Sequence, residues 1–125
     1  MFLLCNKNPN KKVIKNNVIS AVAILFCLKW ETAKSILEYI GATNKEDYDS
    51  IANLDIFLRI NNYRSNVIER SNKHSKCTID DFINGHKKGC YMLLLSDHVV
   101  PVIDGVYYDY YDSKDESVIM YWSDC

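Results

Sequence analysis

Apolar and polar positions divide the chain into a helical first part and a β-rich last third. Residues 18–28 are apolar on nearly every side, interrupted by Ser20. A helix without a polar face is packed on several sides, so this segment predicts a central, buried helix. Residues 30–40 have apolar positions at helical spacing and are followed by Gly41, which predicts an amphipathic helix that ends there.

Two capping patterns predict the starts of further helices. Thr43 followed by Glu46 predicts a third helix whose apolar stripe runs to residue 60. Thr78 followed by Asp81 predicts a short helix that ends near residues 85–89. Between these two helices, residues 67–70 predict a short strand.

The last third has the pattern of strands. Residues 91–95 form an apolar run too short for a typical helix, and residues 98–103 are rich in β-branched side chains. The pair Asp104–Gly105 predicts a tight hairpin into residues 106–111, and a final strand is expected over residues 117–122. Helices followed by strands predict a single α+β domain (1–125): a polar leader (1–15), a mainly helical part (16–88) and an antiparallel meander (89–125).

Composition and charge narrow the class of protein. Hydrophobic residues make up 48% and charged residues 25% of the 125 residues, which excludes a disordered chain. The net charge of -1 disfavours a protein that coats nucleic acid. The longest apolar run is too short to span a membrane, and we expect no signal peptide in the first residues. Five cysteines, odd in number and irregularly spaced, fit reduced thiols in the cytoplasm.

His98 and Asp109 are the candidate chemical groups. If the hairpin turns at residues 104–105, Ile103 lies opposite Val106, and the next strand brings Asp109 within reach of the imidazole. A carboxylate that orients a histidine is part of a nucleophile–base–orienter triad. On spacing alone, a purely structural pair is the alternative interpretation.

A resemblance adds to this hypothesis. Residues 97–113 read Asp-His-Val-Val-Pro, then Asp-Gly at 104–105, then Tyr-Tyr-Asp-Tyr-Tyr-Asp-Ser at 107–113. This segment resembles the last third of small papain-like cysteine peptidase relatives encoded by tailed phages, and residues 79–89 resemble their short helix and following turn. The resemblance implies a papain-like fold, in which a buried central helix packs on a C-terminal antiparallel sheet that carries His98 and Asp109.

The same resemblance implies that the nucleophile has been lost. The family has a cysteine at the start of the central helix, within an Asp-Cys-Val-Ile-Arg-Ala type motif. Here Asn17 occupies the place of the cysteine, Asn16 that of the acid and Ser20 that of the arginine. A carboxamide has no comparable lone pair with which to attack a carbonyl carbon, whereas Asn17 suits a helix N-cap. His98 and Asp109 would then be vestigial.

The expected function is therefore protein binding by a catalytically inactive papain-like protein. The resemblance implies a phage or mobile-element origin and a partner from the bacterial host, for example a defence nuclease inhibited in the manner of an anti-CRISPR protein. Tyr110, Tyr111 and Trp122 are the candidate partner-binding residues, because tyrosine and tryptophan are common at interface hot spots. We expect a cytoplasmic protein with no cofactor, no metal, no membrane contact and no direct nucleic-acid binding.

Two alternatives remain open. The first is an active cysteine peptidase or amidase in which Cys5 attacks, His98 is the base and Asp109 orients it. The second is a small binding module stabilised by zinc, because the spacing of His74, Cys77, His86 and Cys90 resembles that of a tetrahedral zinc site.

Overall fold

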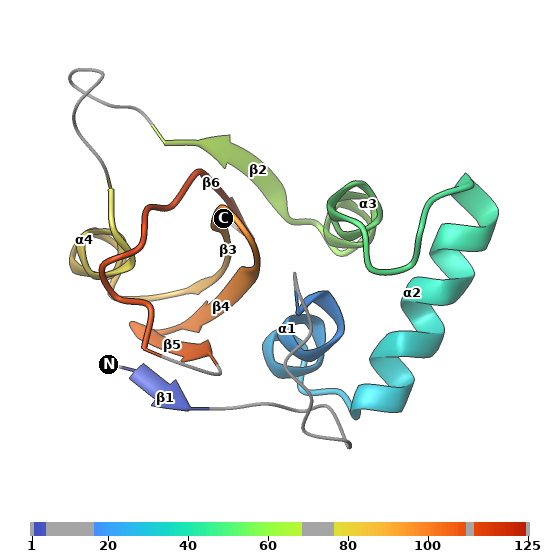
Figure 1. The fold of residues 1–125 in the computed structure, drawn as a ribbon, viewed down its shortest axis with the longest axis horizontal. Helices are drawn as coiled ribbons and strands as arrows, with labels where there is room; N and C mark the ends of the chain where they lie inside the picture. The colour runs from blue at the N-terminus through green and yellow to red at the C-terminus, as the bar shows by residue number, and fades with distance from the viewer. Residues whose placement is uncertain (1, 5–16, 69–76, 110–111, 125) are drawn as a thin grey trace.

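The computed structural model describes residues 2–4, 17–68, 77–109 and 112–124, in which helices cover both faces of one β-sheet (Figure 1). The helices are α1 (Val18–Leu25), α2 (Trp30–Asn44), α3 (Ile51–Ile60) and α4 (Ile79–Gly85). The strands are β1 (Phe2–Leu4), β2 (Arg64–Val67), β3 (Cys90–Leu94), β4 (Val99–Ile103), β5 (Val106–Asp109) and β6 (Met120–Ser123). This arrangement confirms the α+β class.

The sheet has the strand order β1-β5-β4-β3-β6-β2. Its centre agrees with the sequence prediction: β3, β4 and β5 are antiparallel neighbours, and Ile103 lies opposite Val106 across the turn at residues 104–105. The last strand differs from a simple meander, because β6 pairs with β3 and not with β5. The connection that precedes β6 runs beside the start of α4, where Ser117 bridges to Thr78, and this detour carries the chain to the other side of β3.

Two strands from the first half of the chain complete the sheet and make it mixed. Residues 2–4, predicted as part of a polar leader, form β1, which is parallel to β5 and places Leu4 in register with Asp109. β2 is antiparallel to β6 and covers residues 64–67, so the strand predicted over 67–70 is shifted; residues 69 and 70 lie outside the described part. The sheet is therefore not assembled from the C-terminal third alone.

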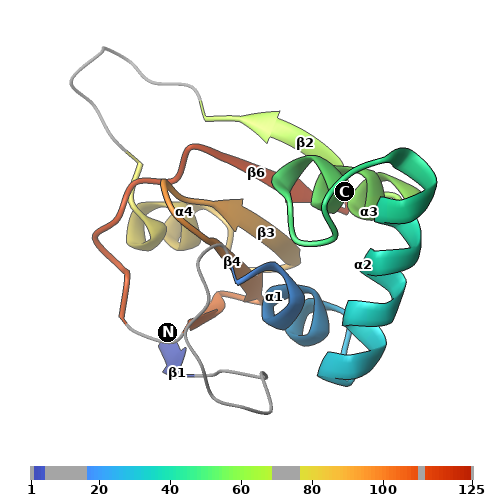
Figure 2. The same cartoon turned by 45° about the vertical axis from the view of Figure 1, so that its right-hand side comes forward.

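α1 is the central helix that the sequence predicted. All eight of its residues are buried. It packs against β3 and β4 on one side and against α2 on the other. Figures 1 and 2 show α1 between the sheet and the outer pair α2 and α3, with α4 on the opposite face of the sheet.

α2 continues past the glycine that was expected to end it. Gly41 is buried within the helix, and Glu46 N–H donates to its carbonyl at 2.9 Å. A Cβ at this position would lie 2.6 Å from the Glu46 carbonyl oxygen. The glycine therefore permits a close backbone approach, and Lys45, with φ 57°, takes the left-handed position at the helix end.

The predicted start of α3 at Thr43 is wrong. The Thr43 hydroxyl donates back to the Tyr39 carbonyl at 3.0 Å within α2, and α3 begins at Ile51 after Ser50, whose hydroxyl accepts from Asn53 N–H at 3.1 Å. Ser and Thr side chains can bond either backward or forward, so the pattern alone does not distinguish these states. The second capping pattern is confirmed, because Thr78 and the residue three positions later form a reciprocal capping box at α4.

Side chains that alternate along the strands divide the core into two parts. Met92 and Val99 face α1, whereas Leu93 and Val100 face α4 and pack with Phe82. This alternation decides which face of the sheet each candidate site residue occupies. None of the described helices has the length and apolar character required to cross a membrane.

Candidate functional site around His98

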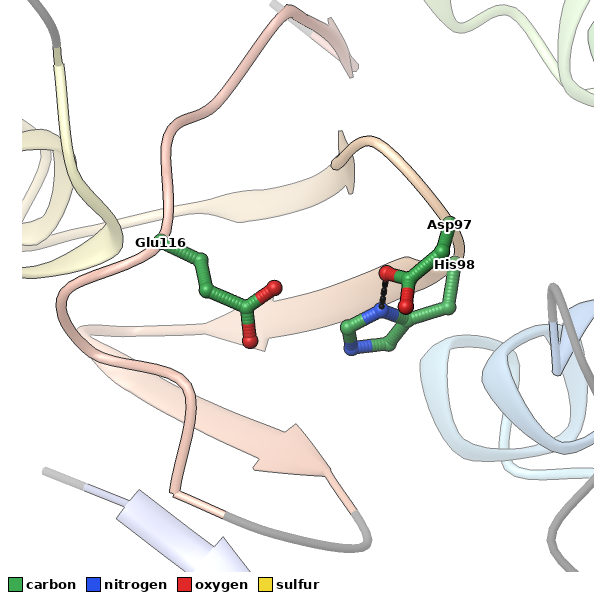
Figure 3. A group of neighbouring side chains, drawn as sticks. All are labelled: Asp97, His98 and Glu116. Atoms are coloured by element: carbon green, nitrogen blue, oxygen red, sulfur yellow. Dashed lines mark hydrogen bonds and ion pairs between the residues drawn. The ribbon is translucent and has the colours of Figure 1, made fainter.

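His98 lies immediately before β4 and points toward the α4 face of the sheet. Its carbonyl accepts from Leu95 N–H at 2.9 Å, which continues the antiparallel pairing of β3 with β4. Alternation then puts its side chain on the same face as Val100. The side chain is fully buried. In Figure 3 the ring points away from the helical ribbon of α1 and toward Glu116.

Asp109 holds one nitrogen of the ring. The Nε2 of His98 lies 2.7 Å from Oδ2 of Asp109, and both side chains are completely buried. Ser113 donates its hydroxyl to the same carboxylate oxygen at 2.6 Å. The predicted proximity of the acid and the imidazole is thus confirmed, while Ser113 is a third member that sequence reasoning missed.

A second carboxylate contacts the other ring nitrogen, and a third lies near the ring. The Nδ1 of His98 lies 2.8 Å from Oδ1 of Asp97, whose side chain is half exposed. Glu116 approaches from the connection before β6, and one ligand atom from each of Asp97, His98 and Glu116 lies within 4.8 Å of the others (Figure 3). The adjacency of Asp97 to His98 was visible in the sequence, but nothing local placed Glu116 here.

The electrostatics of the cluster favour a charged ring. Burial alone would lower the pKa of His98, but the hydrogen bonds to Asp109 and Asp97 outweigh it and raise the pKa above its usual value. A carboxylate accepts hydrogen bonds, so a ring between two carboxylates donates from both nitrogens. Such an imidazolium has no lone pair with which to act as a general base.

The connection that carries Ser113 and Glu116 is held by several hydrogen bonds. The Tyr107 hydroxyl donates to Asp112 at 2.6 Å, and this bond lowers the pKa of the Asp112 carboxyl. The Glu116 backbone is fixed on both sides: its N–H donates to the Ser113 carbonyl at 2.9 Å, and its carbonyl accepts from Ile79 N–H at 3.2 Å. The positions of both side chains therefore follow from an anchored backbone.

Asn17, at the place of the lost nucleophile, lies elsewhere. It precedes α1 in the left-handed conformation, with φ 45°, and its side chain forms no cap hydrogen bond to the helix, contrary to the predicted capping role. The left-handed backbone itself, which asparagine tolerates, explains the choice of residue better. A cavity of about 60 Å³ adjoins Asn17 and is lined in the described part by α1 and by Trp30, Tyr48 and Asp49. Asn17 thus begins the helix on one face of the sheet, while the ring of His98 points to the other.

The candidate partner-binding residues have different outcomes. Trp122 is only 1% exposed, and its indole N–H donates to Asp55 at 2.8 Å, so the prediction that it lies on a binding face is wrong. Its position on β6 turns the indole toward α3 and the α1 side of the core. Tyr110 and Tyr111 lie outside the described residues.

The predicted zinc ligands are not gathered in the described part of the chain, where Asp97, His98 and Glu116 are the group of potential ligands that comes together. His86 donates from Nδ1 to the Phe82 carbonyl at 2.9 Å and stacks on the Phe82 ring. Cys90 lies at the start of β3. His74, like Cys5 of the alternative nucleophile hypothesis, lies outside the described residues.

Comparison with protein-family models, with curated proteins and with solved structures finds no match for this chain.

Proposed function

We propose that this protein is a catalytically inactive, papain-like protein that acts by binding another protein. The observation that carries this proposal is the state of His98: both ring nitrogens lie against carboxylates, and the side chain is fully buried. A general base needs a free nitrogen within hydrogen-bond reach of the proton that it removes. The imidazole in this arrangement therefore has a structural role and not a catalytic one.

Three further features support a degenerate peptidase scaffold. α1 is buried and packs on β3 and β4, as the central helix of the proposed family would. His98 and Asp109 lie on neighbouring strands and contact each other. Asn17 stands at the start of α1, where the resemblance places a cysteine, but the ring of His98 points to the opposite face of the sheet, so the two residues do not form a nucleophile–base pair.

The partner class follows from the resemblance to phage proteins. We propose a protein of the bacterial host cytoplasm, such as a defence nuclease that the chain would inhibit in the manner of an anti-CRISPR protein. Tyr110 and Tyr111 remain the candidate contact residues.

Hydrolysis assays test the loss of activity. We expect no turnover of fluorogenic peptide and amide substrates, and no activity in an Asn17→Cys variant, because the ring of His98 faces away from α1. Both proteins are compared with an active papain-like peptidase in the same assay. Measurable turnover that alkylation of a thiol abolishes would contradict the proposal.

Binding assays test the proposed role. A host protein captured from a bacterial lysate is purified separately, and its affinity is measured by calorimetry against the wild type and a Tyr110→Ala/Tyr111→Ala variant. Tyr39→Ala is the matched control, because Tyr39 is 76% exposed on the outer helix α2. We expect the double variant to weaken binding at least tenfold and the control to leave it unchanged. No saturable binding to any captured protein would reject the role.

One observation favours the alternative of an active cysteine hydrolase. Leu4, the residue before Cys5, is in register with Asp109, the carboxylate that holds His98. If Cys5 were the nucleophile, Cys5→Ala would abolish hydrolysis and Cys27→Ala would not, since Cys27 is an exposed thiol at the far end of α1.

A further inference from the structure

We infer that Asp97, His98 and Glu116 form a binding site for one divalent transition-metal cation, with Nδ1 of His98 and the two carboxylates as ligands. The site is separate from the protein-binding role proposed above. It also departs from the expectation, drawn from the sequence, that the chain holds no metal.

The spacing of the three ligands fits one cation. Their ligand atoms lie within 4.8 Å of one another. Ligands that share a tetrahedral cation at about 2.0–2.2 Å lie roughly 3.3–3.6 Å from each other. Small side-chain rotations of Asp97 and Glu116 therefore suffice, and both side chains are accessible enough to make them: Asp97 is exposed and Glu116 is half-buried.

The surroundings of His98 are those of a metal-ligating histidine. Such a ligand characteristically donates its other ring N–H to a carboxylate, which fixes the tautomer and the orientation of the ring. Here Nε2 donates to Asp109 at 2.7 Å, and Asp109 is itself held by the Ser113 hydroxyl at 2.6 Å. This outer pair is fully buried and occupies Nε2, which leaves Nδ1, already in contact with Asp97, as the nitrogen for a cation.

The ligands come from two segments whose backbones are fixed independently. Asp97 and His98 belong to the turn between β3 and β4, which the Leu95–His98 hydrogen bond closes. Glu116 belongs to the connection anchored to the start of α4 through Ile79. A cation would therefore join the β3–β4 turn to this connection.

Charge also favours a cation. The carboxylates of Asp97, Asp109 and Glu116 surround one imidazole, so that a single positive ring leaves these four groups with a net charge of about -2 when the acids are ionised. With a neutral ring, a divalent ion would reduce the net charge of the three carboxylates from about -3 to about -1. On binding, the cation replaces the proton on Nδ1, which is released to solvent, while the proton on Nε2 stays with Asp109.

The donor set indicates the kind of cation. One imidazole nitrogen with two carboxylate oxygens suits Zn²⁺, Mn²⁺ or Co²⁺ better than Ca²⁺, which takes six to eight oxygen ligands. Three protein ligands leave a further position for water or for a group of a bound partner. The group contains no thiolate, in contrast to the zinc site considered from the sequence.

Co²⁺ titration of the full-length, chelator-treated protein tests the site, because the visible spectrum of bound cobalt reports its ligands. We expect one equivalent to bind with a nitrogen–oxygen spectrum, without the intense thiolate-to-cobalt absorption in the near ultraviolet. Glu116→Gln and Asp97→Asn should each weaken binding at least tenfold. Asp115→Asn is the matched control, since it removes a neighbouring exposed carboxylate and should leave the affinity unchanged.

Three outcomes would overturn the inference. The first is that folded protein, checked by circular dichroism, binds no stoichiometric Co²⁺ or Zn²⁺. The second is a thiolate-to-cobalt absorption band. The third is metal binding that neither ligand variant weakens. Because Asp97 and Glu116 are not part of the buried core, these variants are expected to fold, and their thermal unfolding without metal checks this.

Discussion

At the scale of single residues, His98 shows how a charged side chain can be buried when carboxylates compensate its charge. The ring is completely removed from water, yet a carboxylate lies at each nitrogen, at 2.7 and 2.8 Å. Removing one partner of a buried pair leaves the other without compensation, which is more costly than losing an exposed contact. The two carboxylates should therefore contribute very differently to stability, because only Asp109 is buried.

We predict that Asp109→Asn lowers the free energy of unfolding by about 3 kcal/mol, because it removes the charge that faces the buried ring. Asp97→Asn should cost less than about 1 kcal/mol, since that side chain is 51% exposed. Urea denaturation of chelator-treated protein, followed by circular dichroism, measures both values. Equal losses for the two variants would contradict this assignment of the structural role to Asp109.

The sequence predicted the His98–Asp109 pair because the hairpin between them is local: a two-residue turn sets the register of both strands. Ser113 and Glu116 were missed for the opposite reason. Their positions depend on how the connection before β6 is anchored to α4, which no periodicity in residues 112–119 encodes. Trp122 was predicted on the wrong face because both faces of its strand carry aromatic residues. The sequence therefore does not indicate which face is buried.

At the scale of the elements, glycine and capping residues did not by themselves show where α2 ends and α3 begins, because packing between segments decides these positions. A glycine such as Gly41 is typical of a helix end. Here it lies inside α2, where the chain that follows the helix folds back and packs against it. Helix existence was predicted correctly from the apolar stripes. The end of α2 and the start of α3 were not, since they depend on contacts between segments.

Gly41→Ala should destabilise the protein by about 2 kcal/mol, although alanine favours helices, because the new Cβ meets the Glu46 backbone oxygen. Gly85→Ala is the control: it lies at the end of α4 with no atom within 4 Å of the added Cβ, and it should be neutral or slightly stabilising. Thermal unfolding distinguishes the two. A stabilised Gly41→Ala protein would argue that α2 ends at residue 41 after all.

The two candidate caps of α3 can be separated in the same way. Ser50→Ala should cost about 1 kcal/mol, because it removes the acceptor for Asn53 N–H. Thr43→Ala should change stability by less than about 0.5 kcal/mol, since its exposed hydroxyl bonds only to the preceding helical turn. Denaturant titrations of the two variants report the difference, and a larger loss at Thr43 would favour the helix start predicted from the sequence.

At the scale of the whole molecule, a polar contact connects the sheet to the outer helices. The indole of Trp122 on β6 donates to Asp55 on α3, and Asp55 also pairs with Arg59 at 3.0 Å. This hydrogen bond crosses from the sheet to the outer helical layer. It is partly buried and involves a charged acceptor, which makes it stronger than a neutral hydrogen bond.

We predict that Trp122→Phe lowers the free energy of unfolding by about 2 kcal/mol, through the lost hydrogen bond and the lost ring volume. In a double-mutant cycle with Asp55→Ala, the coupling energy should be about 1 kcal/mol. Chemical denaturation of the four proteins provides the cycle. Additive losses would show that the contact does not couple β6 to α3.

The parallel pairing of β1 with β5 has a consequence for synthesis on the ribosome. Residues 2–4 are made long before residues 107–109, so β1 and the Phe2 ring, which contacts Tyr107 at a centroid distance of 5.3 Å, stay uncovered until β5 has been synthesised. Such long-range closure is slow, and an open strand edge invites pairing with other chains in the meantime. The interval before β1 docks is therefore the period in which newly made molecules are most prone to aggregate.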